Sequence, residues 1–119
     1  METALSSGGL GDNAQGNAIF TRALALRDIG RLEESLADCD MAIQKIPESV
    51  DANFLRAVIL RDLGRDTELV LAALEDTIKI DPDHEVAYDY RADVLRALGR
   101  DEDADRDAAK ADELRAAMQ

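Results

Sequence analysis

Apolar residues recur along this chain at helical spacing, in three rounds of two runs each. In the first run of each round they stand on one helix face, at i, i+4 and i+7: Ile19, Ala23 and Leu26, then Ala57 and Leu60, then Tyr88, Ala92 and Leu95. The second runs carry a similar stripe: Leu36, Cys39, Ala42 and Ile43, then Val70, Leu71, Leu74 and Ile78, then Ala104, Ala108, Ala111 and Leu114. The pattern predicts six helices in three pairs.

One glycine ends the first run of every round. Gly30, Gly64 and Gly99 are 34 and 35 residues apart, and each stands in a similar phrase such as Arg-Asp-Leu-Gly-Arg. Glycine readily takes the left-handed conformation that terminates a helix, so these positions mark helix ends. The other four glycines, Gly8, Gly9, Gly11 and Gly16, gather at the N-terminal end, where we predict a flexible tail over residues 1–15.

Two prolines separate the rounds. Pro47 and Pro82 are 35 residues apart and have the same phase in the period, where they break the chain before the next helix. Pro47 follows its glycine by 17 residues and Pro82 by 18. The second round therefore holds one extra residue, which we place in the turn at residues 65–67.

A fixed period in the thirties is typical of stacked helical repeats. This chain resembles the tetratricopeptide repeat, whose motif is Trp-x₂-Leu-Gly-x₂-Tyr, then Ala-x₃-Phe, then Pro. The motif's Trp, Gly and Tyr positions are occupied in the three units by Ile19, Asn53 and Tyr88, by Ala23, Ala57 and Ala92, and by Leu26, Leu60 and Leu95. Its Leu is replaced by arginine (Arg22, Arg56 and Arg91), and the third unit lacks the closing proline.

The resemblance implies an all-α fold, a right-handed superhelical α-solenoid of three helix-turn-helix units. We expect one domain over residues 16–119, with repeats at about 16–49, 50–84 and 85–119. The first helices of the family line a concave groove in which ligands usually bind. The residues that correspond to its lining here are Asn17, Phe20, Leu24 and Arg27, then Asp51, Phe54, Val58 and Arg61, then Val86, Asp89, Asp93 and Arg96.

These residues would give the groove an apolar stretch in units one and two, carboxylates in unit three and a row of arginines. A peptide with apolar anchors and an acidic group could use both features, because arginine pairs well with carboxylates. In the alternative reading, the two phenylalanines pack between units and the arginines pair with Asp28, Asp62 and Asp93 at the surface. We expect Arg22, Arg56 and Arg91 to cover apolar surface and reach carboxylates, and Arg31, Arg65 and Arg100 to be solvated.

The best-known ligand of the family is the carboxylate at the end of chaperone tails, held by Lys, Asn and Arg. The corresponding positions here, Phe20, Leu24, Leu55, Val86 and Tyr90, carry none of these donors. We therefore expect a different protein partner.

The net charge of −12 argues against nucleic acid or an anionic membrane as the partner, since both favour basic proteins. Neither a secretory signal nor an apolar run of about 20 residues stands out in the sequence. A single cysteine, Cys39, fits a reducing compartment, and we expect the cytoplasm. Two explanations of the acidity stay open, adaptation to high salt and codon bias in a GC-rich genome.

Catalytic and metal-binding groups are scarce. The one histidine, His84, falls in the turn between two repeats, and Cys39 lies on an apolar stripe without a histidine partner. The run at Asp101, Asp103 and Asp105 imitates a calcium loop but has Arg106 where that loop needs glycine. We expect no enzyme activity, cofactor or metal. The predicted function is a protein-interaction scaffold that binds a peptide or helix in the groove, and the alternative is a structural module that self-associates, as a weak homodimer, through its ends or convex face.

Overall fold

The computed structural model describes residues 11–119, and its regular elements are all α-helices. In chain order they are α2 (Asp12–Asp28), α3 (Leu32–Lys45), α4 (Val50–Asp62), α5 (Thr67–Ile80), α6 (Glu85–Ala97) and α7 (Asp101–Ala117). The prediction of three helix pairs is confirmed. Residues 1–10 of the predicted tail lie outside the described residues.

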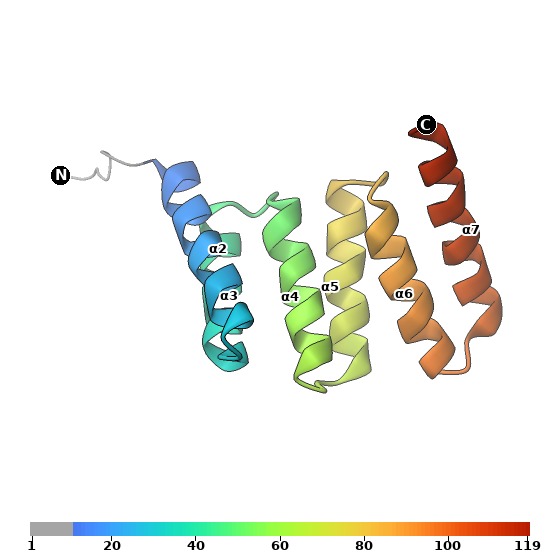
Figure 1. Ribbon diagram of the computed structural model, residues 1–119, viewed down its shortest axis with the longest axis horizontal. Coiled ribbons are helices and arrows are strands. Elements are labelled where there is room, and N and C mark those ends of the chain that lie inside the picture. The colour runs from blue at the N-terminus through green and yellow to red at the C-terminus, as the bar shows by residue number, and fades with distance from the viewer. Residues whose placement is uncertain (1–10) are drawn as a thin grey trace.

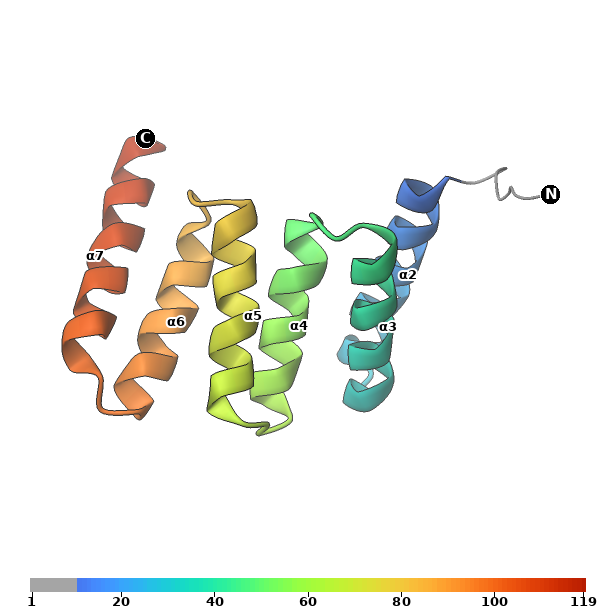
Figure 2. The ribbon, with the colours of Figure 1, turned by 180° about the vertical axis from the view of Figure 1, so that it is seen from behind.

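The helices follow one another along the long axis of the molecule, and each packs mainly against its neighbours in the chain (Figure 1). The pair α2–α3 is seen with α3 behind α2 in Figure 1 and in front of it in Figure 2, whereas α6 and α7 lie side by side in both views. Successive pairs are therefore rotated relative to one another, as in the predicted right-handed superhelical solenoid. The radius of gyration, 16.0 Å, exceeds the roughly 13.5 Å expected of a compact domain of this length.

Each first helix ends in the same backbone motif around its glycine. Gly30, Gly64 and Gly99 have φ values of +83°, +68° and +77°. The residue after each glycine donates a backbone hydrogen bond to the carbonyl five residues earlier, as Arg31 does to Leu26 at 2.8 Å. This is the Schellman motif, and it satisfies carbonyls that would otherwise lack partners at the helix end.

The extra residue of unit two lies in the predicted turn. The second helix starts two residues after Gly30 and after Gly99, but three residues after Gly64. The added residue gives this helix a cap, because Asp66 Oδ1 accepts a hydrogen bond from the backbone amide of Glu68 at 2.8 Å. The equivalent caps of α3 and α7 are arginines, which form no side-chain cap.

Small residues let the paired helices approach closely. Ala23, Ala57 and Ala92, at the motif's glycine position, are buried, as are Cys39 and Leu74 on the facing helices. Ala57, Leu60 and Leu74 belong to one apolar cluster that continues through units two and three, while Ala23 and Cys39 belong to a second cluster in unit one. The core thus consists of two apolar clusters, and Leu36 packs against both.

The motif's Trp position connects each unit to the chain that enters it. Asn53 Nδ2 donates to the carbonyl of Pro47 at 3.2 Å, and Tyr88 Oη donates to the carbonyl of Pro82 at 2.9 Å. Two chemically different side chains therefore make the same contact in units two and three.

The first helix begins earlier than predicted. The expected tail extends to residue 15, but α2 starts at Asp12 and includes Gly16, which is buried. A Cβ atom at Gly16 would lie 2.6 Å from Cδ1 of Ile46. The absence of a side chain at Gly16 therefore lets α2 pack closely against the end of α3. Its role is steric and does not depend on a flexible backbone.

Candidate protein-binding groove

Helices α2, α4 and α6 enclose a pocket of about 260 Å³ on the side of the solenoid that the first helices form. It is lined by eight residues, six of which were predicted to face the groove: Phe20, Leu24, Arg27, Asp51, Phe54, Leu55, Val58 and Tyr90. Leu24 is 40% exposed although it is apolar. The repeat register thus brings apolar side chains from three units to one hollow at the surface.

An aromatic cluster forms the wall of this pocket toward unit three. The rings of Phe54 and Tyr90 meet edge to face with centroids 5.2 Å apart, and the ring of His84 lies 4.8 Å from that of Phe54. The guanidinium of Arg61 lies 5.3 Å from the centroid of Tyr90, within the range of a cation–π contact. These contacts hold the rings in place before any partner arrives.

The remaining predicted groove residues lie elsewhere. Arg61 and Asp93 line a neighbouring pocket with Val94 and Ala97. Asp89 pairs with Arg115 of α7, at the outer end of the solenoid. Asn17 and Val86 are exposed, and neither lines the apolar pocket.

The arginines of the predicted groove row are all paired within the chain. Their partners are carboxylates of the next unit or the next helix: Arg27 with Asp62 at 3.3 Å, Arg61 with Asp93 at 3.9 Å, and Arg96 with Asp105 at 3.0 Å. The alternative reading named Asp62 and Asp93 as such partners. It did not name Asp105, and the third partner it did name, Asp28, forms none of these pairs. The pairs are exposed, so each contributes little to stability.

Carboxylates at the opposite end of the same helices are free of such pairing. Asp12, Asp51 and Glu85 stand in the first turns of α2, α4 and α6. None of them has a hydrogen-bond or ion-pair partner among residues 11–119. Their charge is favoured by the positive end of the helix dipole.

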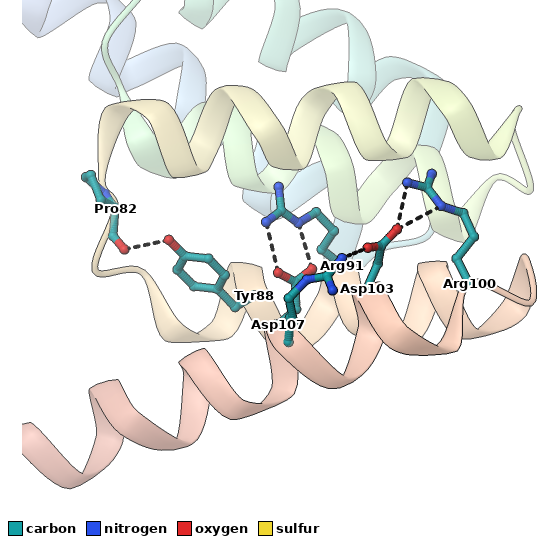
Figure 3. A network of polar contacts seen from close by, with 7 residues as sticks. Pro82, Tyr88, Arg91, Arg100, Asp103 and Asp107 are labelled. Atoms are coloured by element: carbon teal, nitrogen blue, oxygen red, sulfur yellow. Dashed lines mark hydrogen bonds and ion pairs between the residues drawn. The ribbon is translucent and has the colours of Figure 1, made fainter.

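The second arginine row reaches carboxylates as predicted, within a helix pair in units one and three and between two units in unit two. Arg22 donates two hydrogen bonds to Asp38, and Arg91 donates two to Asp107, whereas Arg56 bonds Asp40. Figure 3 shows Arg91 and Asp107 beside a second ion pair, Arg100 with Asp103.

This network lines a pocket of about 210 Å³ between α5, α6 and α7. Its arginines are satisfied by its own carboxylates, since Arg91 pairs with Asp107 while Arg100 and Arg106 both pair with Asp103. The pocket therefore offers a ligand no free cationic group.

The third arginine row is exposed at the turns but not free. Arg31 pairs with Glu34 at 3.0 Å and Arg65 pairs with Glu33. The prediction that these residues are solvated holds for their exposure, and each adds a surface ion pair, which is local for Arg31 and joins two units for Arg65.

The candidate reactive groups have structural contacts. Cys39 is fully buried, and burial raises the pKa of its thiol to about 12, with Asp40 and Asp38 adding to the rise. His84 caps α6, because its Nδ1 accepts a hydrogen bond from the amide of Ala87 at 3.1 Å. A thiol with so high a pKa is a poor nucleophile.

The calcium-like run is the start of α7. Asp101 opens the helix, Asp103 pairs with two arginines and Asp105 pairs with Arg96. From residue 11 onward, no group of three His, Cys, Asp or Glu side chains is placed to hold a metal ion.

Two pocket residues were absent from the predicted groove set. Tyr90 and Leu55 follow Asp89 and Phe54 by one residue, which turns them by about 100° around the helix. That rotation points Tyr90 toward α4, while Asp89 points to α7. The sequence does indicate that both residues face the groove, because Leu55 and Tyr90 stand at positions of the chaperone-tail clamp.

Comparison with known proteins agrees with the repeat fold. No family model matches the sequence. A human protein named Tetratricopeptide repeat protein 13 is 29% identical over 107 residues, which are 87% of this chain and 12% of that protein. A solved structure titled "Crystal structure of MamA" superposes with a TM-score of 0.83 at 20% identity, over 87% of this chain and 60% of that one. Another, "MamA MSR-1 C2", gives 0.78 at 16% identity, over 97% and 63%.

The fold is that of a tetratricopeptide-type solenoid of three helix-turn-helix units. It spans a small part of the human protein and 60% of the first MamA chain. In the tetratricopeptide register, four of the five positions that would hold a chaperone-tail carboxylate are walls of the apolar pocket: Phe20, Leu24, Leu55 and Tyr90. Where that clamp needs donors, this solenoid presents hydrocarbon and aromatic rings. Among residues 11–119, no helix combines the length and apolarity needed to span a bilayer.

Proposed function

We propose that this solenoid is a non-catalytic scaffold that binds a peptide or helix of a partner protein between α2, α4 and α6. The observation that carries the proposal is the pocket itself, in which apolar side chains from three repeats meet at the surface beside an exposed leucine, Leu24. Exposed apolar patches on soluble proteins commonly mark interaction sites.

The size of the pocket favours an anchor side chain over a small molecule. Its volume of about 260 Å³ is below the range of about 300–1,000 Å³ typical of ligand pockets. Leucine or phenylalanine side chains of a docked segment would fill it, as anchor residues do in helix-in-groove and extended-peptide recognition. Aromatic residues such as Phe54 and Tyr90 are enriched in the interfaces that proteins form.

The proposal differs from the sequence-based one in the role of the arginines. Arg27, Arg61 and Arg96 have carboxylate partners within the chain. An acidic group on the partner would have to displace those carboxylates, so the apolar pocket takes the larger part in binding.

A capture experiment with two matched variants tests the proposal. Leu24→Gln places a polar side chain in the pocket wall, and Leu69→Gln makes the same change on α5, where Leu69 is 48% exposed and outside the pocket. Both positions are exposed, so both variants should fold, and circular dichroism checks that they are equally helical. The purified chains are immobilised, incubated with lysate of the source organism and compared by mass spectrometry.

We expect a set of proteins retained by wild type and by Leu69→Gln but lost with Leu24→Gln. Equal retention by all three chains would contradict binding in the groove. Retention of nothing except further copies of the chain, at a level that Leu24→Gln does not change, would favour the self-association alternative.

A further inference from the structure

We infer that the occupant of the groove is a basic segment, with an apolar anchor in the pocket and lysine or arginine side chains along one rim. This inference rests on the proposed function and adds the charge of the partner. It follows from the ion pairs around the groove, which leave one sign of charge unpaired.

Unpaired carboxylates line one edge of the groove. Helices α2, α4 and α6 run in the same direction, and all three start at the upper edge in Figure 1. Their first turns carry Asp12, Asp51 and Glu85, which have no partner among the described residues. Asp51 also lines the apolar pocket. When one side chain of a bound peptide occupies the pocket, a lysine or arginine next to it in that peptide can therefore reach Asp51.

At the opposite edge the arginines are paired, while Asp28 of α2 has no partner among the described residues. The last turns of the same helices carry Arg27, Arg61 and Arg96, and each lies within 4 Å of a carboxylate of this chain. A basic segment meets free carboxylates at one edge and balanced pairs at the other. An acidic segment would meet repulsion at the first edge and occupied arginines at the second.

The aromatic residues strengthen this preference. The chain has two phenylalanines and two tyrosines, and three of these four line the pocket: Phe20, Phe54 and Tyr90. Aromatic faces attract cations, arginine above all. The contact between Arg61 and Tyr90 shows that a guanidinium fits beside these rings.

Long-range electrostatics act in the same direction. The net charge of −12 attracts a basic segment and speeds its encounter, an effect that salt screens. Nucleic acids are disfavoured by the same charge, and the contacts above are those of a peptide.

Selection from a random peptide library tests the inference without knowledge of the natural partner. Displayed 16-residue peptides are selected on the purified chain, and each binder is measured by fluorescence anisotropy against wild type, Leu24→Gln, Asp51→Asn and Asp76→Asn. Asp76 is an exposed carboxylate of α5 that lies outside the pocket, so Asp76→Asn controls for the loss of one charge.

We expect binders that need Leu24 to be enriched in lysine and arginine. Asp51→Asn should weaken them about two- to fivefold, as removal of an exposed ion pair does, and Asp76→Asn should change nothing. Binders that need Leu24 but are acidic or neutral, or that tolerate Asp51→Asn, would overturn the charge inference and leave the groove proposal standing. A library that yields no binder dependent on Leu24 would contradict the groove proposal itself.

Discussion

Arg91 and Asp107 are joined by two parallel hydrogen bonds between α6 and α7. Arg91 Nε and Nη2 donate to the two carboxylate oxygens at 2.7 and 2.9 Å, and the Asp107 side chain is only 10% exposed. The hydrogen bond to Asp107 raises the pKa of Arg91. Arg22 and Asp38 repeat the arrangement in unit one, again 16 residues apart. Such forked pairs favour one register between two helices.

Unit two lacks this arginine–aspartate pair. With its extra turn residue, the position equivalent to Asp38 and Asp107 is Ala73, which is buried. Arg56 therefore has no carboxylate in its own unit and bonds Asp40 of unit one at 2.8 Å. In units one and three this arginine binds a carboxylate of its own unit, whereas in unit two it joins two units.

Removing the two kinds of carboxylate should have different effects. Asp107→Ala leaves the half-buried Arg91 without its partner, and we expect a loss of about 2 kcal/mol of unfolding free energy. Asp40→Ala breaks a pair that is exposed on the Asp40 side, so we expect a loss below about 1 kcal/mol. Urea unfolding followed by circular dichroism measures both. Equal losses would show that burial of the pair has no influence on its strength.

Leu60 tests the stacking of the repeats. Its side chain is 3% exposed and belongs to the cluster that spans units two and three. Leu60→Ala should lower the unfolding free energy by about 2–5 kcal/mol, because it leaves a cavity in the core. Leu69→Ala, at an exposed leucine of α5, should stay within about 0.5 kcal/mol. A loss at Leu60 as small as that at Leu69 would mean that the register is wrong.

Position 16 should be more stable with glycine than with alanine, although it lies in a helix. Alanine is favoured over glycine in helices by about 1 kcal/mol, but its Cβ would lie 2.6 Å from the Ile46 side chain. We expect Gly16→Ala to destabilise wild type and to stabilise a chain that already carries Ile46→Ala. Thermal unfolding of the four chains completes the cycle. A higher midpoint for Gly16→Ala in the wild-type background would contradict the close approach of α2 and α3.

Cys39 should be protected from thiol reagents. Its pKa is raised from 9.0 to about 12, so at pH 8 its thiolate is scarce in the folded chain and its sulfur is inaccessible. We expect negligible labelling by iodoacetamide in the native chain and complete labelling in urea. A variant with Cys39→Ser and Ala109→Cys, at an exposed site on α7, is the positive control. Rapid native labelling of wild type would contradict the burial.

The same raised pKa makes stability fall at high pH. The unfolded thiol ionises near pH 9 while the folded thiol stays protonated until about pH 12. The unfolded chain therefore binds fewer protons in this window, and the contribution of Cys39 to stability declines as the pH rises through it. Cys39→Ala should reduce the slope of unfolding free energy against pH between 9 and 12, and an unchanged slope would contradict the assignment.

Local backbone chemistry made much of the fold predictable. Glycine is the residue that most readily takes the left-handed conformation at a helix end, so Gly30, Gly64 and Gly99 marked three ends before any contact was known. The spacing from Gly64 to Pro82 placed the added residue at a turn, where Asp66 now caps α5.

Side-chain contacts between helices were harder to predict from the sequence. Gly16 was assigned to the tail because nothing in its sequence neighbourhood reports the approach of Ile46. Helical period gave the groove face to within about one residue, which is why Asp89 was included and Tyr90 was not. Pairing of Arg96 with Asp105 depends on the angle between α6 and α7, which the sequence does not encode locally.

Mapping the residues that a bound peptide contacts is the most direct test of the proposed groove. Amide and aromatic ring signals of the ¹⁵N- and ¹³C-labelled chain are recorded by NMR while a peptide that needs Leu24 is added. We predict that the largest shift changes fall on Phe20, Phe54 and Tyr90 and on the first turn around Asp51. Shift changes centred on α5 and α7, with the signals of these four residues unchanged, would contradict a binding groove between α2, α4 and α6.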